Sequence, residues 1–540
     1  MEINTTRPAT MAPRGMVVSS HALASEAGVE ILKAGGSAVD AAIATSAALS
    51  VLYPHMTSLG GDAFWLIYDA EADAVKYLDA AGCAAAGASP GWFEERGFKE
   101  IPFRGVLPAT LTVPGAVDGW CTAHGEFGKL PLARLLAPAA EFARGGFPVT
   151  ARLSSWIAEI ANSGEFNDDA RRIFMPDGAA PPPGARLFNP NLARTIEAVG
   201  DGGHGAFYEG GIARDMAAFA KANGGFFTQA DFRDQHSNWG EPLTGNYRGV
   251  TIYETAPPTQ GFTVLEMLNL LEAYDVSGWD CLGPDHVHFL VQAKQIAYHD
   301  RDAYLADPAF AEMPLERLLS RDYADQRRRL IDLERALSWD RVPSWGTLNG
   351  DTTYIGAVDA WGNAASLIQS VYAVFGSGVV AGDTGVVLQN RSAYFSLDPD
   401  HPNRLEAGKR PLHTLLASLA FRDGKLWQVL GCMGADGQPQ IHLQTYLGLI
   451  DHGLDIQQAV EAPRWLSGRF ALGEPRDLLN IEARFPTATI DELERRGHTV
   501  RRWPDWHELA GHCHGITIDP DHGTRLGGAD PRSDGAAIGY

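Results

Sequence analysis

A threonine at the start of a predicted strand could act as a nucleophile in this chain. Thr352 follows Asp351, and the extended residues 353–357 lead through a turn at Gly362-Asn363 to a second extended stretch, 364–372. This pattern predicts two antiparallel strands joined by a tight turn. If the chain is cut before Thr352, the freed α-amine can take the hydroxyl proton and activate the threonine for acyl transfer. On these residues alone, an ordinary threonine-rich strand start is the commoner explanation.

Composition and charge narrow the classes of function. The 540 residues are 45% hydrophobic, enough for a large core in two to four domains or one layered unit. The net charge is 44 − 66 = −22, which disfavours nucleic-acid partners. No apolar run approaches the roughly 18 residues of a membrane span, and residues 1–14 contain no apolar signal segment. The five scattered cysteines suggest reduced thiols in a cytoplasmic protein.

The first part of the chain is expected to be mostly helical. Helices are predicted over 21–33, ending at Gly35-Gly36, and over 38–51, capped by Ser37. A buried strand is predicted over 60–68. From 131 to 333 the pattern is helical, most clearly over 263–272 and 287–305.

The second part is expected to be rich in strands. Residues 334–350 are polar, with proline and glycine, and indicate an exposed loop where cleavage can occur. The elements predicted after this loop are strands over 353–357, 364–372, 384–388, 418–422, 427–432 and 515–518, and helices over 441–453 and 491–496.

Nine short motifs follow one another along nearly the whole chain. They are Ser37-Ala38-Val39-Asp40-Ala41-Ala42, Leu59-Gly60-Gly61-Asp62, Val113-Pro114-Gly115-Ala116-Val117, Ala256-Pro257-Pro258, Asp302-Ala303-Tyr304-Leu305-Ala306-Asp307-Pro308, Gly376-Ser377-Gly378-Val379-Val380-Ala381-Gly382, Lys409-Arg410-Pro411-Leu412, Ala462-Pro463-Arg464 and Asp530-Pro531-Arg532-Ser533. Each motif alone is weak, but the ordered set together with a threonine-initiated hairpin is specific. The set resembles the γ-glutamyltransferase family of N-terminal-nucleophile hydrolases.

The resemblance implies one four-layer α/β/β/α sandwich made as a precursor. Cleavage between Asp351 and Thr352 would give a large subunit, 1–351, and a small subunit, 352–540, which remain one folded unit and could dimerise further. It implies no cofactor and no metal. The expected partner is a small-molecule amide, with no nucleic acid and no membrane.

The resemblance also assigns roles in acyl transfer. The Thr352 hydroxyl attacks an amide, and its α-amine, with a pKa near about 8, is the base. Ser370 matches a second hydroxyl that hydrogen-bonds the nucleophile, although it could be an ordinary strand serine. Gly434 and Ala435 match a glycine pair whose N–H groups face the oxyanion. A simple helix-entry turn at Gly434-Ala435 is compatible with that role.

The chain departs from the family where a γ-glutamyl group is held. Those places hold Tyr372, Arg391, Tyr394, a residue near Pro90, and His413-Thr414, so the carboxylates that would pair an ammonium are gone. Arg391 could instead clamp a substrate carboxylate with help from His413, or form a structural ion pair. The two tyrosines would shrink the pocket.

Local segments most resemble the oxamate amidohydrolase branch, which hydrolyses oxamate to oxalate and ammonia. These segments are 375–380, 388–391, 395–399 and 437–440. The leading hypothesis is an autoprocessing amidohydrolase acting on a small carboxylate-bearing amide. The alternatives are a γ-glutamyltransferase or glutathione hydrolase, a glutaryl-type acylase and, from another class, an unprocessed, catalytically silent binding protein.

Three polar groups are expected to be structural. His512 and His514 share a strand face and suggest a satisfied structural pair rather than a metal site. Asp285 is expected to cap a helix that carries two surface histidines, His286 and His288. The run Asp300-Arg301-Asp302 is expected to be a solvated helix face.

Overall fold

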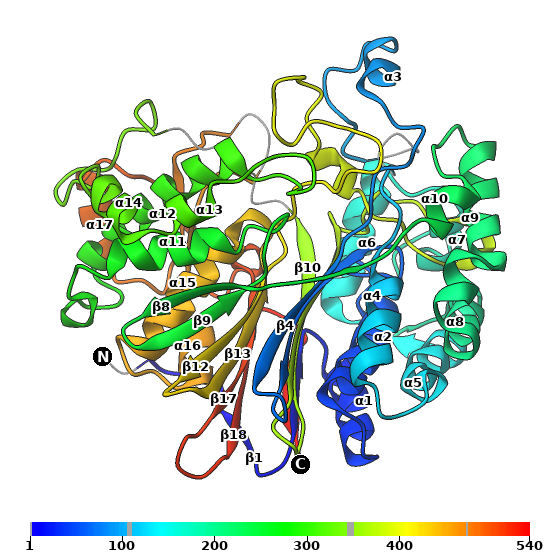
Figure 1. Cartoon of the computed structure of the whole chain (residues 1–540), viewed down its shortest axis with the longest axis horizontal. Helices are drawn as coiled ribbons and strands as arrows, with labels where there is room; N and C mark the ends of the chain where they lie inside the picture. Colours follow the sequence, from blue (N-terminus) through cyan, green and yellow to red (C-terminus); the bar gives the residue numbers. More distant parts are fainter. Residues whose placement is uncertain (1–2, 105–110, 343–349, 471–473) are drawn as a thin grey trace.

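Two seven-stranded sheets lie face to face between two layers of helices (Figure 1). The computed structural model describes residues 3–104, 111–342, 350–470 and 474–540. One outer layer contains α1 (Ala22–Lys33), α2 (Ala38–Leu52) and α5 (Leu132–Gly145). The other contains α11 (Phe262–Leu271), α12 (Pro284–Tyr304) and α15 (Gln438–Ile450). The four-layer α/β/β/α prediction is confirmed.

The first sheet carries the predicted hairpin at its centre. Its order is β19 (Ala536–Gly539), β2 (Met16–Ser19), β10 (Asp351–Val358), β11 (Ala364–Tyr372), β3 (Asp62–Asp69), β4 (Ala74–Ala80) and β7 (Asn238–Gly240). β10 is buried along its whole length and pairs antiparallel with β11 and with β2. The register with β11 shifts between Asp351 and Thr353, so Thr352 lies at a local irregularity.

The second sheet packs against the first. Its order is β1 (Thr10–Ala12), β18 (Arg525–Ala529), β17 (His512–Ile518), β13 (Lys425–Met433), β12 (Ala417–Arg422), β9 (Val250–Glu254) and β8 (Leu243–Tyr247). Tyr354 and Phe64 of the first sheet share one buried apolar cluster with Leu419 and Val429 of the second. Both sheets contain strands from both sides of residue 351.

The remaining elements extend the helical layers and form two small sheets. The helices are α3 (Pro90–Glu94), α4 (Ala116–Phe127), α6 (Ala151–Ser163), α7 (Asp168–Phe174), α8 (Pro190–Tyr208), α9 (Gly211–Ala222), α10 (Gln229–Arg233), α13 (Leu315–Leu318), α14 (Arg321–Arg328), α16 (Ile456–Glu461) and α17 (Thr487–Arg495). The strands are β5 (Phe147–Pro148) with β6 (Arg186–Leu187), and β14 (Trp465–Ser467), β15 (Leu478–Glu482) and β16 (Thr499–Trp503). None of the helices described is both long and apolar enough to cross a bilayer.

The helix α2 shows how the sequence places a helix against this sheet. Ser37 and Asp40 form the expected capping box, with the Asp40 amide donating to the Ser37 hydroxyl at 3.1 Å and the Ser37 amide donating to the Asp40 carboxylate at 3.0 Å. All fifteen residues of α2 are buried, because it packs between α1, α5 and strands β10 and β11. Its many alanines permit that close packing on every side.

Four local predictions differ from the structure. The mostly helical middle contains the hairpin β8–β9, whose turn residues Arg248 and Gly249 have φ of 49° and 81°. Residues 384–388 form a turn with isolated bridges rather than a strand, since Gly385 takes a left-handed conformation. α15 begins at Gln438, three residues before the predicted start. In the predicted exposed loop, Leu337 and Val342 are buried, and 343–349 lies outside the described residues.

Candidate active site

The predicted nucleophile Thr352 lies buried near the start of β10, still joined to Asp351. Its hydroxyl oxygen accepts a hydrogen bond from the Gln438 side-chain amide at 3.5 Å. Gln438 begins α15, and its side-chain oxygen accepts from the Leu416 amide at 3.0 Å, which fixes the orientation of the group. Sequence reasoning missed Gln438, although its position directly after the Gly434 loop was a usable signal.

Ser370 contacts both the peptide bond before Thr352 and Arg391, the predicted carboxylate clamp. It lies on β11, and its hydroxyl donates to the carbonyl of Asp351, the residue before the predicted cut. The same oxygen accepts from the Tyr372 amide at 2.7 Å and from the Arg391 guanidinium at 3.3 Å. In the uncut chain Ser370 therefore contacts the carbonyl; its bond to the nucleophile after cleavage remains a prediction.

The Asp351 side chain is buried beside that peptide. One of its carboxylate oxygens has no hydrogen-bond partner. Burial raises the pKa of Asp351 well above its usual value, and the nearby Glu508 raises it further, against a lowering effect of Arg104. Burial therefore favours the neutral form of this carboxyl group beside the peptide bond to Thr352.

Arg391 is fully buried, and it makes no direct ion pair with a carboxylate among the described residues. Its guanidinium donates to the Thr414 hydroxyl at 3.0 Å and lies 4.6 Å and 5.6 Å from the ring centres of Tyr372 and Tyr394. Its Nε atom has no hydrogen-bond partner in that part of the chain, and the Asp62 carboxyl group interacts with it electrostatically without forming an ion pair. The structural ion pair considered as an alternative is thus not formed.

His413 lies beside Asp62 rather than on the clamp. Its Nε2 is 3.4 Å from an Asp62 oxygen without hydrogen-bond geometry, and its ring packs against Phe64. Burial lowers the pKa of His413 well below its usual value, so the ring is neutral. Burial also raises the pKa of Asp62 to about 7, although Gln389 and the Gly82 amide each donate to it at 2.8 Å. Asp62 is a second polar group near the clamp that sequence reasoning left unassigned.

Gly434 and Ala435 form the loop between β13 and α15, as predicted. Their φ angles are 153° and 47°, so Ala435 takes a left-handed conformation that an L-residue adopts only at a cost. Gly350, two residues before Thr352, packs against this loop, since a Cβ built on it would lie 2.9 Å from the Ala435 Cβ and 3.0 Å from the Tyr372 ring. Gly350 thus lies against both the loop and the tyrosine.

Replacing Ala435 by glycine is expected to raise stability without loss of activity. Relief of the left-handed strain is worth about 1–2 kcal/mol, and the greater freedom of glycine in the unfolded chain removes about 0.4–1 kcal/mol of that gain. The backbone N–H group is unchanged. Thermal unfolding should show a small increase in Tm at unaltered kcat. A decrease in Tm would mean that the Ala435 side chain contributes packing that outweighs the strain.

A buried arginine stabilises the loop that contains Gly434 and Ala435. Arg301 on α12 forms an ion pair with Asp436, and its guanidinium donates to the Gln260 side-chain oxygen at 2.8 Å. The Gln260 amide in turn donates to the carbonyl oxygens of Thr414 and Ala435, at 2.7 Å and 3.2 Å. The prediction of a solvated face at Asp300-Arg301-Asp302 is therefore wrong, because Asp436 makes burial of Arg301 tolerable.

The histidine predictions were partly wrong. His286 and His288 are buried rather than on the surface, and His288 Nδ1 lies 2.8 Å from Nε2 of His498. The cap of their helix is Gly283, with Asp285 in the first turn. His512 and His514 are buried on β17, where His514 contacts the Ser20 hydroxyl at 3.4 Å. Neither ring nitrogen of His512 has a hydrogen-bond partner among the described residues, so the prediction of a satisfied pair holds for His514 alone.

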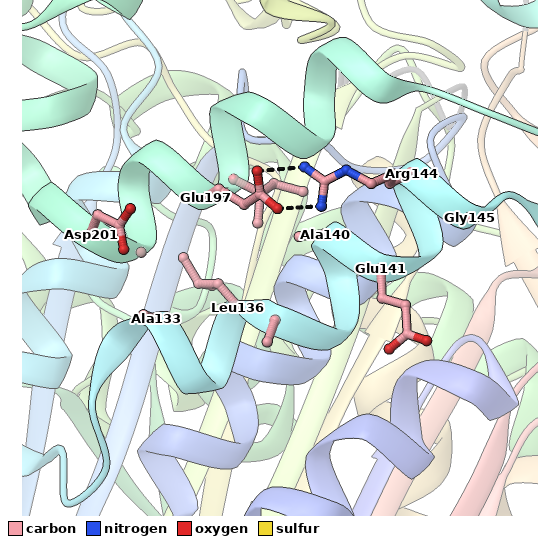
Figure 2. A pocket seen from close by; sticks show the side chains of 11 residues that line it. Ala133, Leu136, Ala140, Glu141, Arg144, Gly145, Glu197 and Asp201 are labelled. Carbon is pink, nitrogen blue, oxygen red and sulfur yellow. Dashed lines mark hydrogen bonds and ion pairs between the residues drawn. The ribbon is translucent and has the colours of Figure 1, made fainter.

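A large surface hollow lies away from these residues. It has a volume of about 500 Å³ and lies between α5 and α8 (Figure 2). Leu136 and Ala140 line it, and the ion pair between Arg144 and Glu197 spans it. None of the predicted site residues borders this hollow, so the shape of the hollow does not indicate which substrate the predicted site binds.

The two facing sheets, the outer helices and the central strand that begins beside Thr352 define the chain as an N-terminal-nucleophile hydrolase fold. The family model of gamma-glutamyltranspeptidase matches residues 24–540, and the chain belongs to that family of enzymes.

Relatives and a solved structure match over nearly the full length. The chain is 42% identical to the glutathione hydrolase-like YwrD proenzyme of Bacillus subtilis, covering 97% of this chain and 98% of that protein. It is 39% identical to the oxamate amidohydrolase proenzyme of Klebsiella pneumoniae, with the same coverage. The cephalosporin acylase of Bacillus halodurans superposes with a TM-score of 0.92 at 35% identity, covering 100% of this chain and 98% of that one.

Proposed function

We propose that this chain cuts itself between Asp351 and Thr352 and then hydrolyses a small amide that carries a carboxylate, as oxamate does. The observation that carries the substrate assignment is Arg391, a buried guanidinium that makes no direct ion pair among the described residues and shares the Ser370 hydroxyl with the carbonyl before Thr352. The names of the matched relatives include proenzymes and an oxamate amidohydrolase, which supports both parts.

The proposed self-cleavage begins with attack of the Thr352 hydroxyl on the Asp351 carbonyl carbon. The Asp351–Thr352 amide bond breaks as an ester forms on the Thr352 hydroxyl, which frees the α-amine. Water then hydrolyses the ester, which releases the Asp351 carboxyl group and restores the Thr352 hydroxyl. The Ser370 hydroxyl already donates to the Asp351 carbonyl oxygen, where negative charge develops during attack. Because burial favours the neutral form of the Asp351 side chain, that side chain would add little repulsion to this charge.

In the proposed turnover the freed α-amine of Thr352 is the general base. The Thr352 hydroxyl attacks the substrate amide, the amine takes its proton, and ammonia leaves with a proton while the acyl ester forms. Water then hydrolyses the ester to the acid. The N–H groups of Gly434 and Ala435 are the proposed oxyanion donors, and loss of one such donor typically costs about 2.7–4 kcal/mol.

The proposed pocket suits a carboxylate better than an α-amino group. A bound carboxylate would form an ion pair with Arg391, with the Thr414 hydroxyl as its neighbour. The ammonium group of a γ-glutamyl substrate would contact Tyr372 and Tyr394 rather than a carboxylate that could pair with it. Asp436, which accepts a hydrogen bond from Tyr394 at 3.1 Å, is already paired with Arg301.

The alternatives are a glutathione hydrolase or an acylase for larger side chains. The 42% identity to a glutathione hydrolase-like protein favours the first of these, and the superposition on a cephalosporin acylase favours the second. The deciding experiment compares kcat/KM for ammonia release from oxamate and from neutral oxamide with nitroanilide release from a γ-glutamyl anilide. A higher kcat/KM for the γ-glutamyl compound would overturn the substrate proposal.

Replacing Arg391 by alanine is expected to raise KM for oxamate about 10- to 100-fold, because a hydrogen bond to a charged group contributes about 1.5–3 kcal/mol. KM for neutral oxamide should change less than about threefold. Steady-state kinetics of the cut variant test this, with denaturing electrophoresis as the check on processing. Equal changes for both amides would show that Arg391 supports the fold rather than the carboxylate.

We also propose that the cut protein is cytoplasmic and consists of two subunits, 1–351 and 352–540, which could dimerise further. Cys432 and Cys513 lie opposite each other on β13 and β17 and are free thiols, which fits a reducing compartment.

A further inference from the structure

Three potential metal ligands gather on the helical layer that contains α4 and α8. Asp118 lies on α4, His204 on α8, and His236 follows α10. Each offers one ligand atom, and these atoms all lie within 4.8 Å of one another. Asp118 is buried, His204 is partly buried and His236 is exposed, so the group is anchored in the protein and open to solvent. None of these residues belongs to the proposed active site.

The local backbone holds Asp118 and His204 in fixed positions. Gly203 interrupts α8 with φ 56° and ψ −139°, which changes the direction of the chain immediately before His204. His204 Nδ1 lies 2.8 Å from Asp118 Oδ1. The Ser237 amide donates to the other Asp118 oxygen, and the Asp118 amide donates to the Tyr208 hydroxyl at 3.0 Å. A carboxylate oriented by such partners is a feature of built metal sites.

We propose that Asp118, His204 and His236 bind one divalent transition-metal ion, with Zn²⁺ as the best match. Two imidazole nitrogens and one carboxylate oxygen are ligands that Zn²⁺ accepts, with water in the fourth position. Ligand atoms around tetrahedral Zn²⁺ are separated by about 3.4 Å. Asp118 Oδ1 and His204 Nδ1, now 2.8 Å apart, would separate slightly as the metal replaces their hydrogen bond, and the exposed His236, whose ligand atom lies within 4.8 Å of the others, would move closer. Its ring is nearly parallel to that of His204, with centres 5.5 Å apart.

The competing explanation is an Asp118–His204 ion pair beside which His236 merely stacks. The hydrogen bond to Asp118 raises the pKa of His204, and Glu209 raises it further against a lowering effect of burial. Protons therefore compete with a metal for His204, and metal affinity should fall as the pH decreases. An ion pair alone predicts no metal binding that requires His236.

The test is Zn²⁺ titration of the full chain by isothermal calorimetry, together with Co²⁺ absorption spectra and thermal unfolding. We expect one Zn²⁺ per chain, a tetrahedral Co²⁺ spectrum, and a Tm increase of about 2 °C at saturating Zn²⁺. His236→Ala, which removes an exposed side chain and should fold normally, is expected to weaken binding at least about 10-fold. His204→Ala should do the same.

The matched control is His522→Ala. His522 is exposed and lies 3.0 Å from Asp519, so it is a histidine–aspartate pair without a second histidine. This variant should bind Zn²⁺ like the parent protein. Absence of stoichiometric binding to the parent, or equal affinity in the parent and His236→Ala, would overturn the proposal. The outcome is independent of amide hydrolysis, so it does not depend on the proposed function.

Discussion

Replacing Thr352 by alanine is expected to leave one uncut chain of 58.2 kDa and to lower amide hydrolysis at least about 10⁴-fold. The variant loses the hydroxyl that is proposed to attack the Asp351 carbonyl, and without cleavage no α-amine is freed to act as base. Denaturing electrophoresis and intact-mass spectrometry report cleavage, and ammonia release reports turnover. The parent protein should give two fragments, the smaller beginning at Thr352.

The neighbouring threonine gives a matched control. Thr353 is buried like Thr352, and its hydroxyl donates to the Gln369 carbonyl at 3.3 Å. Thr353→Ala should be cut and active, and Thr352→Ser should be cut, because serine retains a hydroxyl. Two fragments from Thr352→Ala, or hydrolysis by its single uncut chain, would contradict the proposed mechanism and leave the silent binding protein or another nucleophile to be considered.

Replacing Arg301 by alanine is expected to lower the free energy of unfolding by about 3–5 kcal/mol, because the buried Asp436 carboxylate loses its counterion. The same change frees Gln260, which holds the carbonyl of Ala435. We therefore expect kcat to fall as well, since the proposed oxyanion donors depend on this loop. Urea unfolding of the cut protein, and kcat measured well below its midpoint, test the two effects separately.

A surface arginine provides the comparison. Arg214 on α9 is 67% exposed and lies 3.5 Å from Asp215, so Arg214→Ala should change stability by less than about 0.5 kcal/mol. Arg301→Lys should be intermediate, because a single ammonium cannot bond Asp436 and Gln260 with the geometry of a guanidinium. A loss below about 1 kcal/mol in Arg301→Ala would mean that Asp436 finds another partner or takes up a proton.

The parts of the fold that sequence could predict are those with a strong local signal. The hairpin β10–β11 follows from extended residues around a glycine turn, and α2 follows from its capping box and alanine content. The hairpin β8–β9 was missed because its strands are five residues long, partly exposed and weak in hydrophobic pattern. Only its turn at Arg248-Gly249 carried a usable signal.

The residues of the site also divide into those with a strong local signal in the sequence and those without one. Thr352, Ser370 and Gly434 lie in local motifs, so their proximity followed from the resemblance. Asp62 lies 290 positions before Thr352, and its contact with His413 depends on how β3 packs in the sheet. Arg301 shows the opposite difficulty: its charge indicated an exposed position, but it is buried with ion pairs to the adjacent Asp302 and to Asp436, 135 positions later. Such information lies in tertiary structure, not in local sequence.

The position of β2 determines how the two proposed subunits are related after a cut. β2 belongs to the part before residue 351, yet it pairs with β10 on one side and β19 on the other, both from the part after it. Removing it would break two strand pairings and leave the edge strand β19 without a neighbour in the sheet. Dissociation of the cut protein would therefore be the same event as unfolding, so the Tm of the cut protein would depend on protein concentration, whereas that of the uncut chain would not.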